Sequence, residues 1–245
     1  MVEPLFKLHL DQPPTVGSVV QLAGDEAKHA IAVRRMRVGE AIQLTNGLGL
    51  RVRGEVARVD AKALQVSVTA VAQEPRPSLD ITLVQALAKG DRDELAIQAS
   101  TELGIMQVVP WQAERSISRW DAGKAAKGQV RWQVICDEAA KQSLRVWHPK
   151  VHSAVATAEL ADTLAEFDRV FVLDPTAEVG LAAQPLAQGK IAVIVGPEGG
   201  IDEVELSRFE AAGAIRVRLG EAILRTSTAG VVAVTIIQSS HGIFG

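Results

Sequence analysis

Two glycine-containing loops near the C-terminal end of the chain constrain its fold more than any other feature. The first, Gly-Pro-Glu-Gly-Gly at residues 196–200, follows the apolar run 191–195, which is typical of a buried strand. The second begins at Gly220, after a predicted strand at residues 215–219, and leads into an apolar helix over residues 227–238 that we expect to be buried. Glycines at strand ends let the backbone approach a ligand closely. The pattern therefore predicts a ligand crevice at the carboxyl edge of an open α/β sheet.

Strand-like and helix-like segments alternate upstream of these loops, which indicates a mostly parallel sheet. The predicted strands are 81–87, 105–111, 150–152 and 170–173, and the predicted helices are 91–104, 122–144 and 158–167. Asp91 is expected to cap the first of these helices, Leu95, Ala99 and Leu103 to line one of its faces, and Gly104 to end it. Asp202, three residues before Glu205, predicts a capping box that starts a further helix reaching residue 212.

The N-terminal part of the chain has the pattern of a small β domain. Its predicted strands are 19–23, 41–45, 50–59 and 64–70, and a short helix is predicted over residues 26–36. Asn46-Gly47 is a strong hairpin signal, because both residues tolerate positive φ. Pro75 and Pro77 interrupt regular structure. We therefore expect a first domain over residues 1–73, a linker over 74–78 and an α/β domain over 79–245.

Composition restricts the class of protein. The 245 residues are 47% hydrophobic and 22% charged, with a net charge of −3, as is normal for a soluble globular chain. No apolar run approaches the roughly 20 residues of a membrane span, and the N-terminus lacks a signal-peptide core, so a cytoplasmic protein is expected. Cys136, the single cysteine, is predicted to be a small buried hydrophobe. The histidines form no zinc motif, and no metal is expected.

The motifs resemble those of the RsmE-type 16S rRNA (uracil-N3)-methyltransferases, in the SPOUT class of RNA methyltransferases. The resemblance rests on Leu-Gly-Glu-Ala-Ile-Leu-Arg-Thr-Ser-Thr-Ala at residues 219–229 and on the first glycine loop. Further matching residues are His29, Arg34-Arg35-Met36, Gly39, Lys89-Gly90-Asp91, Glu102-Leu103-Gly104, Arg115-Ser116, Gln142-Ser143 and Arg145. The resemblance implies a knotted α/β domain preceded by a PUA-like β-barrel domain. It also implies a homodimer, with one uridine of 16S rRNA in the small ribosomal subunit as the substrate.

The resemblance further implies that the cofactor S-adenosylmethionine lies between the two glycine loops and the strand end at Leu173. The expected cofactor-binding residues are Leu173, Gly196, Pro197, Glu198, Gly199, Gly200, Leu219, Gly220, Ile223, Leu224, Arg225, Thr226, Thr228 and Ala229. This agrees with the chemistry of the side chains, because adenine needs an apolar slot in which backbone N–H and C=O groups are accessible.

Arg225 and Glu198 are the candidate catalytic residues. Arg225 is expected either to orient the uracil or a phosphate, or to pair with a carboxylate such as Glu198 and hold the loops. Glu198 is expected to anchor its loop by accepting backbone N–H bonds, or else to help remove the proton from uracil N3. The methyl donor is already activated by its positive sulfur, so that positioning can supply much of the rate.

Candidate RNA-binding residues are basic or polar and lie mainly in the N-terminal part. They are His29, Arg34, Arg35, Arg37, Arg51, Arg53, Arg115, Ser116 and Arg145. Arg51 and Arg53 alternate on one predicted strand and should point to one face, as expected of a phosphate-tracking surface or of a solvated charged face.

Three positions depart from the family pattern: Ala99, Lys141 and Ser227 stand where members often carry Lys, Glu and Glu. A family mechanism that used those side chains could not operate here. The alternatives are therefore another RNA methyltransferase of the same class, acting on a ribose or a different base, and a non-catalytic RNA-binding assembly factor.

Overall fold

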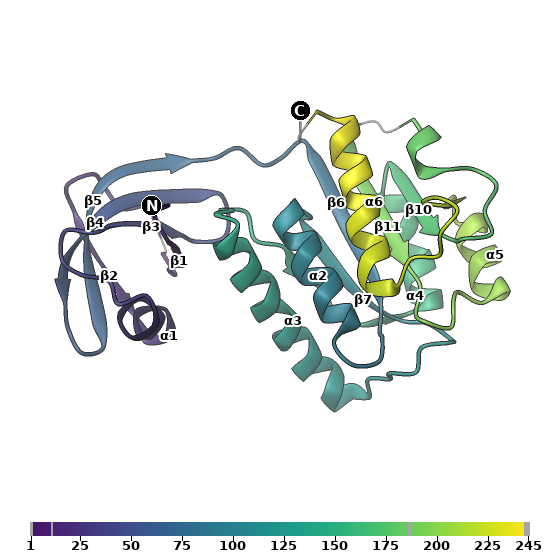
Figure 1. Cartoon of the computed structure of the whole chain (residues 1–245), viewed down its shortest axis with the longest axis horizontal. Helices are drawn as coiled ribbons and strands as arrows, with labels where there is room; N and C mark the ends of the chain where they lie inside the picture. The colour runs from purple at the N-terminus through teal and green to yellow at the C-terminus, as the bar shows by residue number, and fades with distance from the viewer. Residues whose placement is uncertain (1, 11, 186–187, 243–245) are drawn as a thin grey trace. The chain divides into compact units, whose positions relative to one another are not determined.

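The computed structural model describes residues 2–10, 12–185 and 188–242 (Figure 1). The chain divides into two compact units. The first consists of Met1–Arg76 with Ala140–His148, and the second of Pro77–Ala139 with Pro149–Gly245. Each unit has its own hydrophobic core.

The first unit is a curled five-stranded sheet in the order β1-β3-β4-β5-β2. Its strands are β1 (Leu5–Lys7), β2 (Val19–Ala23), β3 (Ala41–Thr45), β4 (Leu50–Val59) and β5 (Ala63–Gln73). β1 runs parallel to β3, and the other pairs are antiparallel. The predicted hairpin at Asn46 is confirmed: its side chain accepts the N–H groups of Leu48 and Leu50, at 2.8 and 3.2 Å.

The helix predicted over residues 26–36 is replaced by two shorter elements. α1 (Gly24–Lys28) continues into the π-helical turn η1 (His29–Val33), which the Arg34 N–H closes on the His29 carbonyl at 3.0 Å. The wider turn places Ala27, Ala30 and Met36 in the core, and it ends before Arg35, whose φ is +54°. A regular helix could not continue through that positive φ.

The return segment Ala140–His148 belongs to the first unit, whereas the sequence analysis assigned it to the second domain. Lys141 is buried and forms an ion pair with Glu26. The Leu144 carbonyl accepts a hydrogen bond from Arg51 at 3.1 Å, and the indole of Trp147 donates to the Pro75 carbonyl at 3.0 Å. The partners in these contacts are far apart in the sequence, so a local pattern cannot identify them. The helical periodicity of the segment alone therefore assigned it to the second domain.

The second unit is a parallel sheet in the order β12-β10-β11-β6-β7-β8, with β9 also paired to β7, which confirms the predicted parallel sheet. Its strands are β6 (Leu79–Ala86), β7 (Gln107–Gln112), β8 (Lys150–Val151), β9 (Val155–Ala156), β10 (Arg169–Leu173), β11 (Gly189–Val195) and β12 (Ile215–Val217).

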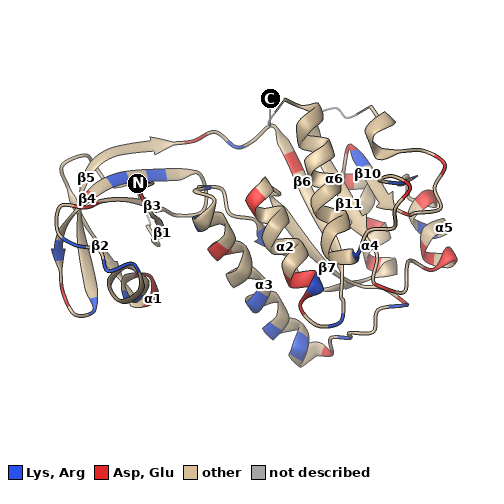
Figure 2. Ribbon diagram, in the orientation of Figure 1, with Lys and Arg blue, Asp and Glu red and all other residues tan. Residues whose placement is uncertain are grey.

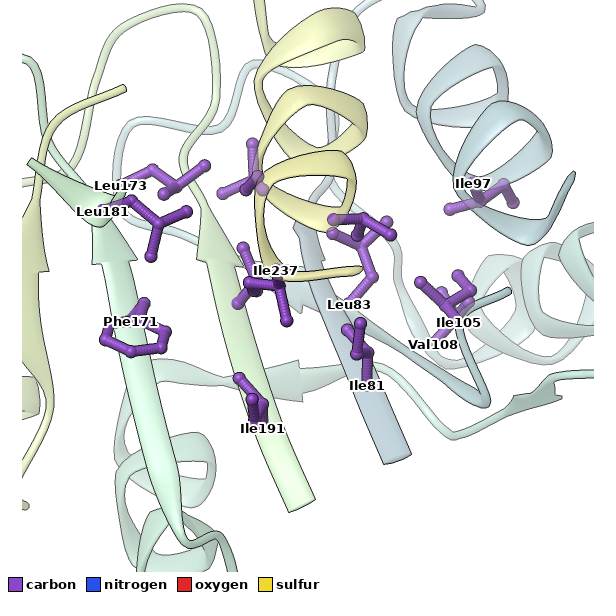
Figure 3. Close-up of a cluster of buried hydrophobic side chains, with 14 of the residues drawn as sticks. Ile81, Leu83, Ile97, Ile105, Val108, Phe171, Leu173, Leu181, Ile191 and Ile237 are labelled. Carbon is purple, nitrogen blue, oxygen red and sulfur yellow. The ribbon is translucent and has the colours of Figure 1, made fainter. Parts of the chain in front are cut away.

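Helices cover both faces of this sheet, because alternate strand residues point to opposite sides. On one face, α6 lies beside α2 (Figure 1), and the core of that face includes Ile81, Leu83 and Ile237 (Figure 3). On the other, α4 and α5 pack over residues such as Val84 and Ile194. The bounds are α2 (Arg92–Leu103), α3 (Ala122–Gln142), α4 (Thr157–Thr163), η2 (Leu164–Glu166), η3 (Leu181–Ala183), α5 (Glu203–Ala211) and α6 (Thr226–Ser240).

The capping box at the start of α5 is confirmed: the Asp202 side chain accepts the Val204 N–H at 3.0 Å, and Glu205 reaches back to the Asp202 N–H. The face predicted for α2 is only partly right. Leu103 packs against the core, but Leu95 is 49% exposed, and the buried residues of the helix include Ala96, Ile97, Ser100 and Thr101. Asp91 is the N-cap residue of α2, as predicted, but its side chain makes no capping hydrogen bond. The Asp93 carboxylate instead accepts the Ala88 N–H at 3.0 Å in the turn before the helix.

Cys136 lies in the core of the second unit, as the sequence predicts, and Trp132 belongs to the same core. Burial raises the pKa of the Cys136 thiol to about 12, so the thiolate does not form at neutral pH.

α6 is less buried than predicted, since Thr228 and Thr235 are exposed and Val231, Val232 and Ile236 are half-buried. No helix in the described part of the chain is long and apolar enough to cross a membrane.

Candidate ligand site at the carboxyl ends of three strands

A cavity of about 530 Å³ lies within the second unit, at the carboxyl ends of β10, β11 and β12. The sheet order explains its position. The chain leaves β11, passes through α5 and returns as β12 on the far side of β10, whereas β6 and β7 extend the sheet in the opposite direction. The loops that follow the strands therefore separate at this point, and such a switch point leaves room for a ligand.

The predicted cofactor residues gather around this cavity. All of them line it except Gly199 and Thr228. Two of the glycines are closely packed by neighbouring side chains. A Cβ on Gly196 would lie 2.6 Å from Ile201 Cγ1, and one on Gly199 would lie 3.2 Å from Arg115 Cβ. Side chains at these two positions would push Ile201 and Arg115 away, so the glycines allow the first loop to pack closely against both residues.

Thr226, the first residue of α6, joins both glycine loops to the sheet. It is 6% exposed, and its hydroxyl donates to the Gly196 carbonyl at 2.8 Å. The same oxygen accepts a hydrogen bond from the fully buried Gln85 side chain of β6, also at 2.8 Å. Gln85 was absent from the sequence prediction, and the one available signal was a polar residue inside an otherwise apolar strand.

Glu198 is held by donors from a neighbouring segment. Its carboxylate accepts the Lys89 N–H at 2.9 Å and a guanidinium N–H of Arg92 at 2.7 Å. Burial alone would raise the pKa of Glu198, but hydrogen bonds from its own backbone, from Lys89 and from Arg92 outweigh that effect and hold the pKa below its ordinary value. A carboxylate so satisfied is a weak base, and this geometry favours the anchor role.

Arg225 borders the cavity at the N-terminus of α6 and is exposed. The ion pair between Arg225 and Glu198 that the sequence analysis considered does not form in the structure. Glu198 forms an ion pair with Arg92 instead. The Arg225 carbonyl accepts the N–H groups of Thr228 and Ala229, at 2.8 and 2.9 Å, which starts the helix. Its guanidinium is therefore available to a ligand.

The sequence did not predict an ion pair between Asp174, which lines the cavity, and Arg216. Asp174 follows β10 directly, and its carboxylate accepts hydrogen bonds from Nη2 of Arg216 of β12 and, at 2.8 Å, from Nε of the same side chain. Burial would raise the pKa of Asp174, but the Thr176 backbone and the Arg216 and Thr176 side chains outweigh it and lower that pKa. The pair fixes the ends of two adjacent strands. An acidic residue immediately after a buried strand was the signal for it.

Arg115 and Ser116 belong to the second unit and not to the N-terminal basic surface. Arg115 lines the cavity and pairs with Asp202 at 3.0 Å. Ser116 is 5% exposed, and its hydroxyl has no hydrogen-bond partner within the described residues.

The remaining RNA-binding candidates lie in the first unit, where Figure 2 shows basic residues on the sheet and beside α1. Those that are exposed are Arg34, Arg35, Arg37 and Arg53. Two arginines are engaged by the protein itself. The Arg51 guanidinium donates to Glu74, Gln43 and the Leu144 carbonyl, at 2.5, 2.5 and 3.1 Å. Arg145 is largely buried, and that burial lowers the pKa of its guanidinium although Glu74 counteracts it. His29 packs its ring edge against Phe6, with 5.7 Å between centroids.

Within the described residues, no cluster of three or more His, Cys, Asp or Glu side chains could hold a metal ion. The fold and the site together define an α/β protein with a ligand cavity at the switch point of a parallel sheet and a separate small β unit.

Comparison with known proteins gives the same picture. Residues 74–238 match the RNA methyltransferase domain family, and residues 22–69 match the RNA methyltransferase PUA domain. The ribosomal RNA small subunit methyltransferase E of Mycobacterium tuberculosis is 39% identical over 238 residues, which cover 95% of this chain and 90% of that protein. The chain therefore belongs to the ribosomal RNA small subunit methyltransferase E family.

Two solved structures are similar over almost the whole chain. The ribosomal RNA small subunit methyltransferase E of Neisseria gonorrhoeae, bound to S-adenosyl methionine, has a TM-score of 0.87 and 30% identity, with 98% of each chain covered. A methyltransferase of Legionella pneumophila, in complex with the bound cofactor SAM, has a TM-score of 0.88 and 28% identity at the same coverage.

Proposed function

We propose that this chain transfers a methyl group from S-adenosylmethionine to N3 of one uridine in 16S rRNA of the small ribosomal subunit. The observation that carries the proposal is the cavity at the ends of β10, β11 and β12, whose two glycine loops are tied together by Thr226. The relatives act on RNA of the small subunit by name, and two similar structures contain this cofactor. A ribosomal substrate implies action in the cytoplasm.

The lining of the cavity fits the proposed cofactor. Its volume of about 530 Å³ lies within the usual range of sites for small ligands, about 300–1,000 Å³. Leu173, Leu219 and Leu224 offer apolar walls for an adenine ring, while Gly196 and Gly220 expose backbone polar groups beside them. A Cβ at Gly220 would meet nothing within 4 Å, so the backbone there borders open space.

The side chains around the cavity are suited to positioning more than to proton removal. Bound S-adenosylmethionine supplies a methyl group on a positively charged sulfur, which is a strong electrophile. Three carboxylates line the cavity: Glu198 forms an ion pair with Arg92, and Asp174 and Glu203 both form ion pairs with Arg216. Glu198 and Asp174 have pKa values below their ordinary ones. We propose that Arg225 binds a uracil carbonyl oxygen and stabilises the negative charge that develops as the N3 proton leaves to water. N3 then forms the new bond to carbon as the carbon–sulfur bond breaks.

The exposed arginines of the first unit are proposed to bind RNA phosphates. Arg34, Arg35, Arg37 and Arg53 suit this role, whereas Arg51 is better described as a structural residue because its guanidinium is occupied. The double variant Arg34→Ala plus Arg35→Ala should weaken RNA binding and leave cofactor binding unchanged. Equal loss of both activities would indicate misfolding and remove the support for an RNA surface here.

A trefoil knot and a homodimer, both implied by the resemblance, remain predictions. The hydrogen bond between Thr226 and Gly196 supports the knot, because it brings the last helix beside a loop that left the sheet earlier. The half-buried Val231, Val232 and Ile236 of α6 support a partner surface on that helix. Sedimentation equilibrium tests the dimer directly, and a monomer at micromolar concentration would refute it.

The decisive experiment is transfer of labelled methyl from S-adenosylmethionine to small ribosomal subunits from a strain that lacks this gene. Nucleoside mass spectrometry then identifies the product, and label in N3-methyluridine is the expected result. Label in a ribose-methylated or other nucleoside would establish a different RNA methyltransferase of the same class. Absence of label together with absence of cofactor binding by calorimetry would favour the non-catalytic assembly factor.

A further inference from the structure

We propose that a pocket within the first unit binds one unpaired nucleotide of the RNA substrate. The pocket has a volume of about 310 Å³ and is formed by three separate stretches of chain. These are residues 2–6, the η1 region with His29 and Arg34, and residues 141–144 of the return segment. Every residue that lines it belongs to the first unit, so it is distinct from the cofactor cavity. The proposal rests on the proposed function and adds a base-recognition site to it.

Two helix ends border this pocket. Within the described residues, Arg35 and Leu144 are the only non-glycine residues with positive φ, at +54° and +57°, and each follows the end of a helical segment. At the end of α3 the Leu144 N–H donates to the Lys141 carbonyl at 3.1 Å and the Arg145 N–H to the Ala140 carbonyl at 2.8 Å, which is a common way for a helix to end. Leu144 lines the pocket, and Arg35 follows the lining residue Arg34. The ends of two helical segments thus form two sides of the pocket.

An ion pair in the first unit fixes the return segment that forms one side of the pocket. Lys141 is 4% exposed and pairs with Glu26, which also accepts the Lys7 N–H at 3.1 Å. The Glu26 carboxylate therefore balances the positive charge of the buried lysine. The structure gives the Gln142 side chain and the Arg34 guanidinium no hydrogen bond or ion pair within the described residues, and both are exposed. Two unlike polar groups are accordingly presented to solvent at the pocket.

These groups match the parts of a nucleotide. An arginine binds a phosphate through several N–H donors, and a glutamine amide offers one donor and one acceptor to the edge of a base. Val2, which is exposed, and Pro4, which is half-buried, supply apolar surface for a base face, and the His29 ring packs against the buried Phe6. Sequence-specific recognition of RNA acts on bases that are splayed out of a helix. A pocket of about 310 Å³ suits one such nucleotide and excludes a duplex.

Three variants distinguish the contributions of the Gln142 amide and the Arg34 guanidinium to RNA binding from the effect of removing any surface positive charge. Gln142→Ala removes the amide, Arg34→Ala removes the cation, and Lys62→Ala, which removes an exposed lysine outside the pocket, is the control matched in charge to Arg34→Ala. Binding of each protein to naked 16S rRNA and to small subunits lacking the modification is measured across a series of salt concentrations. Thermal unfolding confirms that the three proteins remain folded.

Gln142→Ala should bind naked rRNA about tenfold more weakly with an unchanged salt dependence, because a neutral base contact is lost. Arg34→Ala should also bind more weakly, and the slope of log K against log salt should fall by about 0.7, the contribution of one phosphate of a single strand. Lys62→Ala should bind with an affinity close to that of the wild type. Uridine monophosphate should compete better than inorganic phosphate at equal ionic strength.

The proposal is overturned if Gln142→Ala and Lys62→Ala bind naked rRNA equally well. It is also overturned if naked rRNA binding is unchanged while subunit binding falls, since the pocket would then hold a segment of a ribosomal protein. Better competition by inorganic phosphate would reduce the pocket to an anion site and refute base recognition. Methyl transfer and cofactor binding by the wild type, measured on the same preparation, show separately whether the proposed function fails.

Discussion

Replacing Thr226 with valine tests whether one hydroxyl couples the glycine loops to the sheet. Valine keeps the shape and the β-branching of threonine, so the change removes only the hydrogen bonds to Gly196 and Gln85. Two buried hydrogen bonds contribute about 1 kcal/mol each, and the Gly196 carbonyl left short of a donor costs about 1 more. The variant should therefore lose about 2–3 kcal/mol of unfolding free energy. Gln85 retains a bond to the Ala86 carbonyl at 3.1 Å, which limits the loss.

The assay is urea unfolding followed by tryptophan fluorescence, which reports mainly on the second unit because Trp111, Trp120 and Trp132 lie there. Thr235→Val is the matched control: it changes an exposed threonine on the same helix and should cost less than about 0.5 kcal/mol. Cofactor affinity, measured by calorimetry, should fall roughly fivefold in Thr226→Val as the loop loses preorganisation. Equal stability of the two variants would refute the coupling, and a destabilised protein with wild-type affinity would refute its role in binding.

Three further predictions follow from the site. Glu198→Gln should weaken cofactor binding while turnover at saturating cofactor persists; an unchanged dissociation constant with lost turnover would show instead that Glu198 acts as a base. Because the pKa of Asp174 is depressed, its stabilising contribution is complete above its ordinary pKa of 3.8 and is lost as pH falls through the lower folded value. Asp174→Asn should accordingly be less stable than the wild type at pH 7, with the difference shrinking in acid titrations below pH 3.8. Cys136 should resist thiol reagents at pH 8 until the protein is unfolded, and rapid labelling of the native protein would contradict its burial.

The elements that the sequence predicted best are those whose signals are local. β2, β3 and β4 have their predicted ends, because alternation and the Asn46 turn lie within a few residues. The two glycine loops at the cavity were also predicted, since the glycines and the apolar strands that precede them are adjacent in the chain. The capping box of α5 was visible for the same reason, as Asp202 and Glu205 are three residues apart.

The parts that the sequence did not predict depend on partners far along the chain. Nothing near Glu198 identifies Arg92 as its partner, and nothing near Asp174 identifies Arg216. The face of α2 was assigned only partly correctly: hydrophobicity pointed to Leu95, which is exposed, whereas α6 packs against α2 and several of the buried residues of α2, Ala96, Ser100 and Thr101, are small. Close approach of two helices favours small side chains, a requirement that hydrophobicity alone does not encode.

The return segment Ala140–His148 has the strongest consequence for function. It enters the first unit at a buried lysine, and Leu144 takes a positive φ before the chain leaves again. Two hydrogen bonds end α3 at this point, from the Leu144 N–H to the Lys141 carbonyl at 3.1 Å and from the Arg145 N–H to the Ala140 carbonyl at 2.8 Å. The helix end leaves Gln142 as an exposed amide at a pocket that the other two segments complete. This position is what the proposed recognition role requires of the segment. If the segment were only a connection, Gln142→Ala would leave RNA binding unchanged, so this variant distinguishes the two explanations.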